Sequence, residues 1–230
     1  MKIYSFTFAR SGSKGIKNKN LKIFNKKPLV CWAIKNSVQS KIINKTFIST
    51  DSKKIAKLSK NEGAIIPFLR PKKLSTDKSP EWLSWKHAIN YLKKKNDIPE
   101  IFVSVPCTSP LRKSSDLDMI IKKLIKIKKA DAVVGITYSN RNPYFNMVKM
   151  NKKGKLSILM KSKKNFFRRQ DCPEVFDLTT FAFAIKTKFL LKAKNLFSGN
   201  VYGHIVDKKR SIDIDNILEL KIAEYIKKII

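Results

Sequence analysis

The sequence predicts an α/β fold of three layers, in which helices cover both faces of a mostly parallel sheet. Segments with the apolar patterns of strands and of helices alternate along the 230 residues, as they do in chains that form parallel sheets. Residues 101–105 are almost continuously apolar, which is typical of a strand that is covered on both faces. With 43% hydrophobic and 29% charged residues, the chain can bury a core, and its length favours a single domain over 1–230.

The first half of the chain opens with a strand and then alternates. Residues 3–9 alternate apolar and small polar side chains, and lead into a loop that contains two glycines. Pro28 fits the first turn of a helix, where proline is well tolerated. The elements expected next are a helix over 28–40, a strand over 46–49, a helix from Asp51 or Ser52 to Glu62 with Gly63 as its stop, and a helix from Ser79 through Leu92.

The second half continues this alternation until about residue 138. The turn over 106–112 leads into a helix that starts near Ser115, where Asp118 can complete a capping box. From 138 to 177 the pattern changes to Pro, Asn and aromatic residues with only short strand-like pieces, which predicts an inserted, protruding β-rich arm. The expected core is completed by strands over 132–137, 181–185 and 201–206 and by a helix that begins at Asn216.

The net charge of +33 is unusual, but its distribution does not favour a nucleic-acid interface. Lysine and arginine together number 50, of which only seven are arginine. Arginine is the residue of bidentate phosphate and base recognition, whereas lysine acts as a solvated point charge. The lysines occur in nearly every segment rather than in one stripe. The excess of positive charge is therefore interpreted as a general bias of the composition and not as a binding surface. We expect no nucleic-acid partner, although a basic nucleic-acid-binding protein remains an alternative that rests on the net charge alone.

Cysteine, histidine and hydropathy exclude several other classes of protein. Three scattered cysteines are too few for a disulfide scaffold or a zinc site. With only His87 and His204, a histidine-rich metal centre or a histidine-based triad is not expected. No run of about 18 apolar residues occurs, and the first residues enter a strand-like pattern without the apolar core of a signal peptide. These features predict a cytoplasmic protein that has no membrane partner.

The loop after the first strand is basic and rich in glycine. It contains Arg10, Gly12, Lys14, Gly15 and Lys19. Glycines let the backbone approach a ligand closely, and clustered cations offset phosphate charge. The spacing matches neither a P-loop nor a dinucleotide fingerprint, so a merely flexible basic turn is the alternative. Its position favours a ligand site, because ligands of open α/β sheets bind beyond the carboxyl ends of the strands.

Two acids near the end of the chain form the second candidate site. In an extended segment over 211–215, Ile212 and Ile214 would face the core while Asp213 and Asp215 project together on the other side. Two carboxylates arranged in this way can bind a hard divalent cation such as Mg²⁺. The alternative is that Asp215 caps the last helix. A cation held there could also bind phosphate oxygens presented by the basic loop.

Taken in order, these motifs resemble those of the acylneuraminate cytidylyltransferases, the CMP-sialic acid synthetases and their relatives. The resemblance covers essentially the whole chain. It is specific to this family because several motifs occur together in the family's order and approximate spacing. The stretch 141–148 resembles most the branch that activates legionaminic acid-type sugars. The motifs that carry the family resemblance are 9–15 with Lys19-Asn20-Leu21, 48–51, 68–71, 108–112, 168–171 and 211–215.

The resemblance implies a Rossmann-like nucleotidyltransferase fold and a reaction in which CTP and a nine-carbon keto-sugar acid give a CMP-sugar and pyrophosphate. It also implies catalytic, nucleotide-binding, sugar-binding and metal-binding residues. The implied catalytic residues are Arg10, Lys14, Lys19, Asp213 and Asp215, and the implied nucleotide-binding residues are Arg10, Ser11, Gly12, Lys14, Lys19, Asn20 and Arg70. For the sugar acid they are Thr108, Ser109, Arg169 and Gln170, with Arg169 facing the substrate carboxylate. For catalysis and the metal, Mg²⁺ with Mn²⁺ as an alternative, they are Asp213 and Asp215.

The resemblance further implies that the arm over 138–177 forms a homodimer and contributes to the neighbouring sugar pocket. Two departures from the family pattern make N-acetylneuraminate itself a less favoured substrate. Pro106-Cys107 stands where sialic acid enzymes carry Gln-Pro. The later motif of this chain, residues 176–180, reads Phe-Asp-Leu-Thr-Thr, where those enzymes carry an Asn-Gly-Ala motif. A CMP-Kdo-type synthetase, which acts on an eight-carbon acid, is the alternative enzyme.

Each of these residues also has a purely structural interpretation. Arg70, which precedes a proline, could be an extended surface residue. Thr108 and Ser109 could cap a turn, and Arg169 could be a solvated charge of the arm. Asp51 is expected to cap a helix rather than to act as a catalytic acid.

Overall fold

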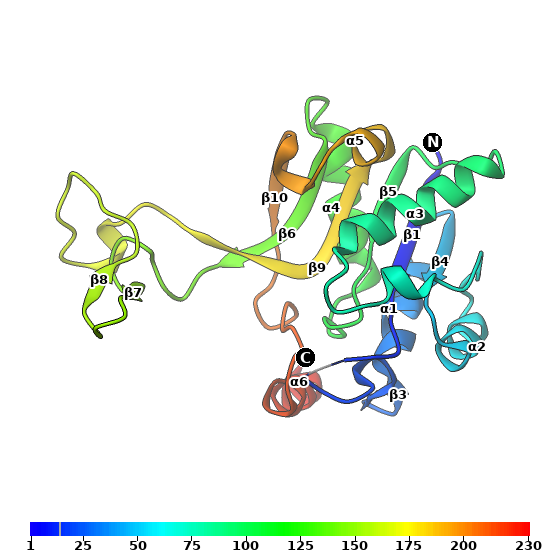
Figure 1. Cartoon of the computed structure of the whole chain (residues 1–230), viewed down its shortest axis with the longest axis horizontal. Coiled ribbons are helices and arrows are strands. Elements are labelled where there is room, and N and C mark those ends of the chain that lie inside the picture. The colour runs from blue at the N-terminus through cyan, green and yellow to red at the C-terminus, as the bar shows by residue number, and fades with distance from the viewer. Residues whose placement is uncertain (14) are drawn as a thin grey trace.

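The structure is a computed structural model that describes residues 1–13 and 15–230, and within these residues six strands form one central sheet (Figure 1). The strand order is β10-β6-β9-β5-β1-β4. Five of these strands run in the same direction, and β9 is antiparallel to both of its neighbours. The strands are β1 (Ile3–Phe8), β4 (Lys45–Ser49), β5 (Ile101–Ser104), β6 (Ala132–Tyr138), β9 (Phe176–Lys186) and β10 (Val201–Ile205). The expected α/β fold with a mostly parallel sheet is therefore confirmed.

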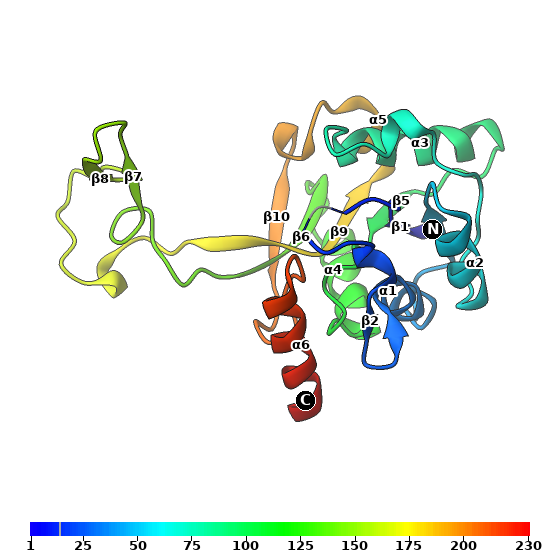
Figure 2. The same ribbon diagram turned by 60° about the horizontal axis from the view of Figure 1, so that its bottom comes forward.

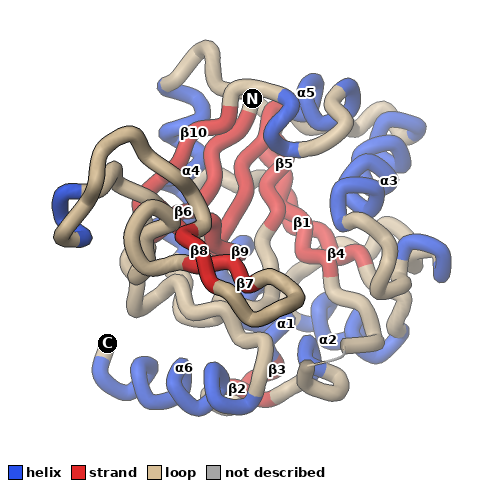
Figure 3. Tube along the Cα trace, turned by 60° about the vertical axis from the view of Figure 1, so that its left-hand side comes forward, coloured by secondary structure: helices blue, strands red, loops and turns tan. Residues whose placement is uncertain are grey.

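Helices cover both faces of the sheet, which makes three layers (Figures 1 and 3). Alternation along β1 decides which face each side chain enters, because successive side chains of a strand point to opposite faces. Tyr4 and Phe6 pack with Trp85 and other residues of one helical layer, whereas Ile3 packs with the other. The first layer consists of α3 (Glu81–Lys94) and α5 (Thr187–Lys192). The second consists of α1 (Leu29–Val38), α2 (Lys53–Asn61), α4 (Ser114–Lys126) and α6 (Ile217–Ile229).

Capping side chains fix where the helices begin. The Ser52 hydroxyl accepts a hydrogen bond from the backbone N–H of Ile55, so Ser52 caps α2. The sequence-based expectation that Asp51 is a helix cap is wrong, because the Asp51 carboxylate binds Ser11 instead. Gly63 follows α2 with φ +96°, in the left-handed region that glycine adopts at no steric cost.

The cap of α4 lies two residues earlier than the expected capping pair of Ser115 and Asp118. The carboxylate that accepts from the backbone N–H at the start of α4 belongs to Asp116, which accepts from Lys113. Asp118 instead accepts a hydrogen bond from the Ser40 hydroxyl, beyond the end of α1. The helix begins at Ser114, so Asp116 stands at its third residue, two positions before Asp118. The expected reciprocal capping box does not form, because the residue before the helix is Lys113, whose side chain cannot accept a hydrogen bond.

An arm projects from one end of the sheet between β6 and β9 (Figures 1 and 2). It carries the antiparallel pair β7 (Val148–Met150) and β8 (Leu156–Ile158). Its base is the two-stranded ribbon in which Tyr138 of β6 pairs with Phe176 of β9. A further short antiparallel pair, β2 (Ile23–Phe24) and β3 (Lys27–Pro28), precedes α1. Among the described residues, no helix is long and apolar enough to cross a membrane.

Candidate functional site

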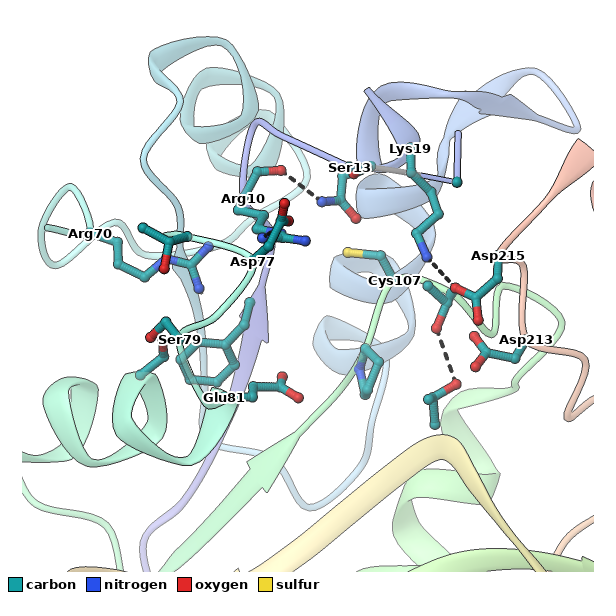
Figure 4. Close-up of a pocket in the computed structure, with 18 of the residues that line it drawn as sticks. Arg10, Ser13, Lys19, Arg70, Asp77, Ser79, Glu81, Cys107, Asp213 and Asp215 are labelled. Atoms are coloured by element: carbon teal, nitrogen blue, oxygen red, sulfur yellow. Dashed lines mark hydrogen bonds and ion pairs between the residues drawn. The ribbon is translucent and has the colours of Figure 1, made fainter. Parts of the chain in front are cut away.

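A pocket of about 590 Å³ lies at the edge of the sheet where the parallel strands end (Figure 4). The loops that follow β1 and β5 and the segment before α6 contribute to its walls. Because parallel strands end at one edge, residues far apart in the sequence meet there. The expected site residues that line this pocket are Arg10, Lys19, Asn20, Arg70, Thr108, Asp213 and Asp215.

The basic loop after β1 is held in place by two sets of hydrogen bonds. The side-chain amide of Asn20 donates to the carbonyl oxygen of Arg10 at 2.9 Å. The backbone N–H and the hydroxyl of Ser11 donate to the Asp51 carboxylate at 2.8 and 2.7 Å. Burial alone would raise the pKa of Asp51, but the hydrogen bonds from Ser11 and the charge of Arg70 outweigh it and lower the pKa. Asp51 therefore acts as an ionised anchor for the loop, and Ser11 faces it rather than the pocket.

The basic loop and the two acids come together, as the sequence predicts. The Lys19 ammonium lies 2.6 Å from a carboxylate oxygen of Asp215. The backbone approaches just as closely, because a Cβ atom added to Gly15 would collide with the carbonyl oxygen of Asp215. Gly12 meets no such neighbour. Lys14, which we expected to hold the triphosphate, lies outside the described residues.

The acidic segment is tied to the loop that follows β5. The backbone N–H of Ile214 donates to the carbonyl oxygen of Thr108 at 2.9 Å, and the Ile214 side chain is fully buried. One carboxylate oxygen of Asp213, Oδ1, is buried and has no hydrogen-bond partner among the described residues. Asp215 does not cap α6, because Asn216 does so by accepting from the N–H of Glu219. Oδ1 of Asp213 therefore remains available to a ligand of the pocket, whereas the Asp215 carboxylate is held by Lys19 rather than by α6.

Arg70 is a buried cation with unused hydrogen-bond donors. It is 7% exposed, and its Nε and Nη2 atoms have no partner within the described parts of the chain. The segment before it runs beside β4, with a bridge between Thr50 and Leu69, so Arg70 reaches the same edge of the sheet. Burial lowers the pKa of the guanidinium, and Asp51 and Glu81 oppose this effect. The interpretation of Arg70 as a surface residue is therefore wrong.

Two acids of the pocket were not among the residues expected from the sequence. Asp77 forms an ion pair with Arg10 across the pocket (Figure 4). Glu81, the first residue of α3, also lines the pocket, where desolvation raises the pKa of its carboxyl group against the indole N–H donor of Trp85 and the charge of Arg70. Neither residue stands in a motif with a recognisable spacing. The only signal in the sequence was the rarity of acids, 17 in 230 residues.

The loop after β5 places a row of hydroxyl groups. The hydroxyl of Thr108 lies 3.1 Å from that of Thr180 on β9, and both residues line the pocket. Ser109 is fully buried behind them, with its hydroxyl 3.3 Å from that of Thr180. The buried Arg112 guanidinium donates to the carbonyl oxygens of Pro106 and Ser109, which fixes the shape of this loop. Thr180 is a pocket residue that sequence analysis did not select.

Arg169 and Gln170 lie elsewhere in this chain. Both line a separate hollow of about 450 Å³ at the base of the arm, together with Ser139, whose carbonyl oxygen accepts a hydrogen bond from Arg169. Neither lines the pocket that contains Asp213. Within one chain, the structure thus does not bring Arg169 and Gln170, which we expected to bind the sugar acid, to the other site residues.

Known proteins share both the sequence pattern and the fold. The family described as Cytidylyltransferase matches residues 7–217. The chain belongs to the cytidylyltransferase family. Post-translational flagellin modification protein B of Campylobacter coli is 30% identical to this cytidylyltransferase over 225 residues, which cover 96% of the chain and 92% of that protein.

A second relative and a solved structure extend the similarity. CMP-N,N'-diacetyllegionaminic acid synthase of Campylobacter jejuni is 29% identical over 222 residues, which cover 95% of this cytidylyltransferase and 92% of the relative. The structure of CMP:2-keto-3-deoxy-manno-octonic acid synthetase complexed with CTP aligns with a TM-score of 0.74, 11% identity and 99% coverage of both chains. At that identity the structural similarity shows the fold alone. The family resemblance that the sequence motifs indicated is confirmed.

The two aspartates of this cytidylyltransferase fit a hard divalent cation. Carboxylate oxygens are the ligands that Mg²⁺ prefers, and this ion usually binds one or two carboxylates together with phosphate oxygens and water. The unpartnered Oδ1 of Asp213 meets the first requirement. Within residues 1–13 and 15–230, no group of three or more His, Cys, Asp or Glu could surround a metal ion. The pocket thus fits a cation whose remaining ligands come from a bound nucleotide and water.

Proposed function

We propose that this cytidylyltransferase activates a nonulosonic acid, of the sialic or legionaminic type, by joining it to CMP from CTP. The observation that carries the proposal is the single pocket in which the basic loop and the two aspartates meet, with Lys19 and Asp215 2.6 Å apart. The relatives at about 30% identity include CMP-N,N'-diacetyllegionaminic acid synthase, whose name describes a reaction of this form. The reaction would take place in the cytoplasm, where CTP is available. Its product, the CMP-sugar, would then be used in the synthesis of surface glycans.

The residues of the pocket have different roles in this reaction. Arg10 and Lys19 bind the triphosphate and neutralise charge that develops on it, and Lys14 belongs to the same loop by its sequence position. Asp213 and Asp215 hold Mg²⁺, or Mn²⁺ as an alternative, and the ion supplies charge neutralisation at the phosphate oxygens. Thr108 and Thr180 offer hydroxyl groups to the sugar acid. No protein nucleophile is required, because the sugar hydroxyl displaces pyrophosphate directly and catalysis comes from positioning and electrostatics.

Two ion pairs in the pocket indicate what nucleotide binding must change. Arg10 is paired with Asp77, and Lys19 is paired with Asp215. A bound triphosphate would take over both cations, since charge-assisted bonds to phosphate are among the strongest in proteins. The Asp215 carboxylate would then be free to turn to the metal. Asp213 needs no such release, because its Oδ1 atom has no partner among the residues that the structure describes.

We also propose that the arm forms a homodimer and completes the sugar site of the partner subunit. Arg169 and Gln170 stand at the base of the arm, outside the pocket of their own chain. The arm exposes large apolar side chains, among them Phe167 at 85% and Met150 at 71% exposure, and exposed apolar clusters mark interaction surfaces. Light scattering of the purified protein tests this: a monomer at micromolar concentration contradicts it.

The substrate is tested by a panel of sugar acids. The purified protein is incubated with CTP, Mg²⁺ and one acid at a time: N-acetylneuraminate, a legionaminic acid, a pseudaminic acid and Kdo. Pyrophosphate release is measured. Turnover with a nine-carbon acid is expected. Turnover with Kdo alone would favour the eight-carbon alternative, and no CTP-dependent release with any acid would refute the proposal. Retention on duplex DNA near physiological salt would revive the nucleic-acid alternative.

A further inference from the structure

The wall of the pocket away from the two aspartates carries Glu81, which has no role in the site described so far, beside Arg70, which the family resemblance places at the nucleotide. Glu81 stands there at the start of α3, and Arg70 enters from the segment beside β4 (Figure 4). Both residues line the pocket, and no direct ion pair joins them among the described residues. Arg70 is more than nine-tenths buried and keeps two N–H donors without a partner in the described parts of the chain. A buried donor without a partner costs free energy, so this wall is built for a ligand that accepts hydrogen bonds.

The neighbouring surface is apolar and suits a flat ring. Phe8, at the end of β1, and Phe183 of β9 are half-buried and line the same pocket, as does Leu74. A ligand that enters here meets aromatic side chains beside an acceptor, Glu81, and a donor, Arg70. The cations that suit phosphate, Arg10 and Lys19, belong to the loop after β1 and the short turn that follows it.

The two pyrimidine bases differ at the positions that such a pair can read. Both carry an O2 oxygen that accepts hydrogen bonds. At C4, cytosine carries an amino group that donates, whereas uracil carries an oxygen that accepts. An ionised carboxylate only accepts hydrogen bonds, and a guanidinium only donates them. Carboxylates are accordingly known to accept from the cytosine N4 amino group.

We propose that Glu81 makes the protein select CTP over UTP, by accepting a hydrogen bond from the cytosine amino group while Arg70 donates to O2. This inference rests on the proposed function and adds to it the residue that identifies the base. The selection has an attractive and a repulsive part. The carboxylate pairs with the amino group of cytosine, and it faces the lone pairs of O4 when uracil enters. Arg70 contributes affinity rather than selection, because both bases carry O2.

The experiment measures equilibrium binding of CTP and of UTP by calorimetry, in the presence of Mg²⁺ and without a sugar acid, so that no turnover occurs. The wild-type protein is expected to bind CTP at least about tenfold more tightly than UTP, within the range of one good polar contact to a base edge. Glu81→Gln keeps the shape of the side chain but adds a donor that can pair with O4. We expect this substitution to reduce the preference to within about threefold.

Matched variants separate base reading from general effects. Glu224→Gln makes the same chemical change on α6, outside the residues that line the pocket, and is expected to keep the full preference. Arg70→Lys is expected to weaken CTP and UTP by similar factors, because the lost contact is to an oxygen that both bases share. Melting temperatures of all variants show that each is folded. Glu81→Asp, which withdraws the carboxylate by one methylene, serves if Glu81→Gln does not fold, with the same expected loss of preference.

Each outcome decides the inference. Retention of the wild-type preference by Glu81→Gln would overturn it and leave the proposed function intact. An equal loss of affinity for both nucleotides would show that Glu81 binds a group they share, such as a ribose hydroxyl, and would also overturn it. If the wild-type protein bound neither nucleotide, or showed no preference for CTP, the proposed function itself would fail.

Discussion

Gly15 offers the sharpest test of the way the pocket is assembled. Its α-carbon faces the carbonyl oxygen of Asp215 so closely that an added Cβ atom would lie well inside 3.0 Å, a separation that real Cβ atoms essentially never show. Ordinary contact begins at 3.4 Å. Gly15→Ala therefore forces the basic loop and the acidic segment apart by a distance on the order of 1 Å. A misplacement of that size can reduce the rate of a positioned reaction by about 10²-fold, or about 2.7 kcal/mol in activation free energy.

The assay compares kcat/KM for CTP in Gly15→Ala, Gly12→Ala and the wild-type protein, with melting temperatures as the measure of folding. Gly12 belongs to the same loop, but a Cβ atom added there meets nothing within 4 Å. Alanine also retains the backbone N–H through which such a glycine can contact phosphate. We expect Gly12→Ala to lose no more than about threefold and Gly15→Ala about 10²-fold, with little change in either melting temperature. Equal activity of the two variants would refute the reasoning that loop and acids must stay in contact.

Three further perturbations test other parts of the molecule. Asp213→Ala is expected to abolish turnover with the fold intact, because it removes a metal ligand from the pocket rather than a core contact; wild-type rates at saturating Mg²⁺ would contradict this. Arg10→Ala is expected to lower kcat/KM for CTP by about 30-fold, or about 2 kcal/mol, the contribution of one charge-assisted phosphate contact; an unchanged value would remove Arg10 from the site. Asp97→Asn addresses stability, because hydrogen bonds from Lys45 and Tyr4 lower the pKa of Asp97 to about 2. A lowered pKa stabilises the fold above the unfolded-state value, 3.8, and this stabilisation disappears as the pH falls through the folded-state value. The variant should thus lose about 1–2 kcal/mol at pH 7 after allowance for solvent screening, with the difference vanishing between about pH 4 and pH 2 in denaturant titrations.

The fold could be predicted from the sequence because its signals are local. The alternation of strand and helix patterns identified the central strands and the major helices, and Asn216 marked the start of the last helix. Finer features depend on tertiary contacts. Either Asp116 or Asp118 could accept a hydrogen bond from the backbone at the start of α4. Which of them does so depends on the residue at which the preceding turn ends and the helix begins. The direction of β9 follows from the arm, which returns the chain to the end of the sheet from which it left.

The candidate site could be predicted where its residues stand in compact motifs. The loop with Arg10 and Lys19 and the segment with Asp213 were both found, and the structure joins them. Glu81 and Asp77 could not be found in this way, because they reach the pocket through the placement of α3 and the segment before it. Conversely, the family motif that contains Arg169 says nothing about which chain's pocket that residue serves.

The antiparallel strand β9 has a consequence for any attempt to redesign this protein. Its first residues pair with β6 at the root of the arm, its middle carries Thr180 into the pocket, and its last residues lie between β5 and β6 in the sheet. The arm therefore cannot be exchanged as an independent module at an arbitrary junction. A graft that changed the length of β9 by one residue would turn Thr180 to the opposite face of the sheet. Chimeras between relatives should keep β9 whole and exchange only the chain beyond the pairing of Tyr138 with Phe176.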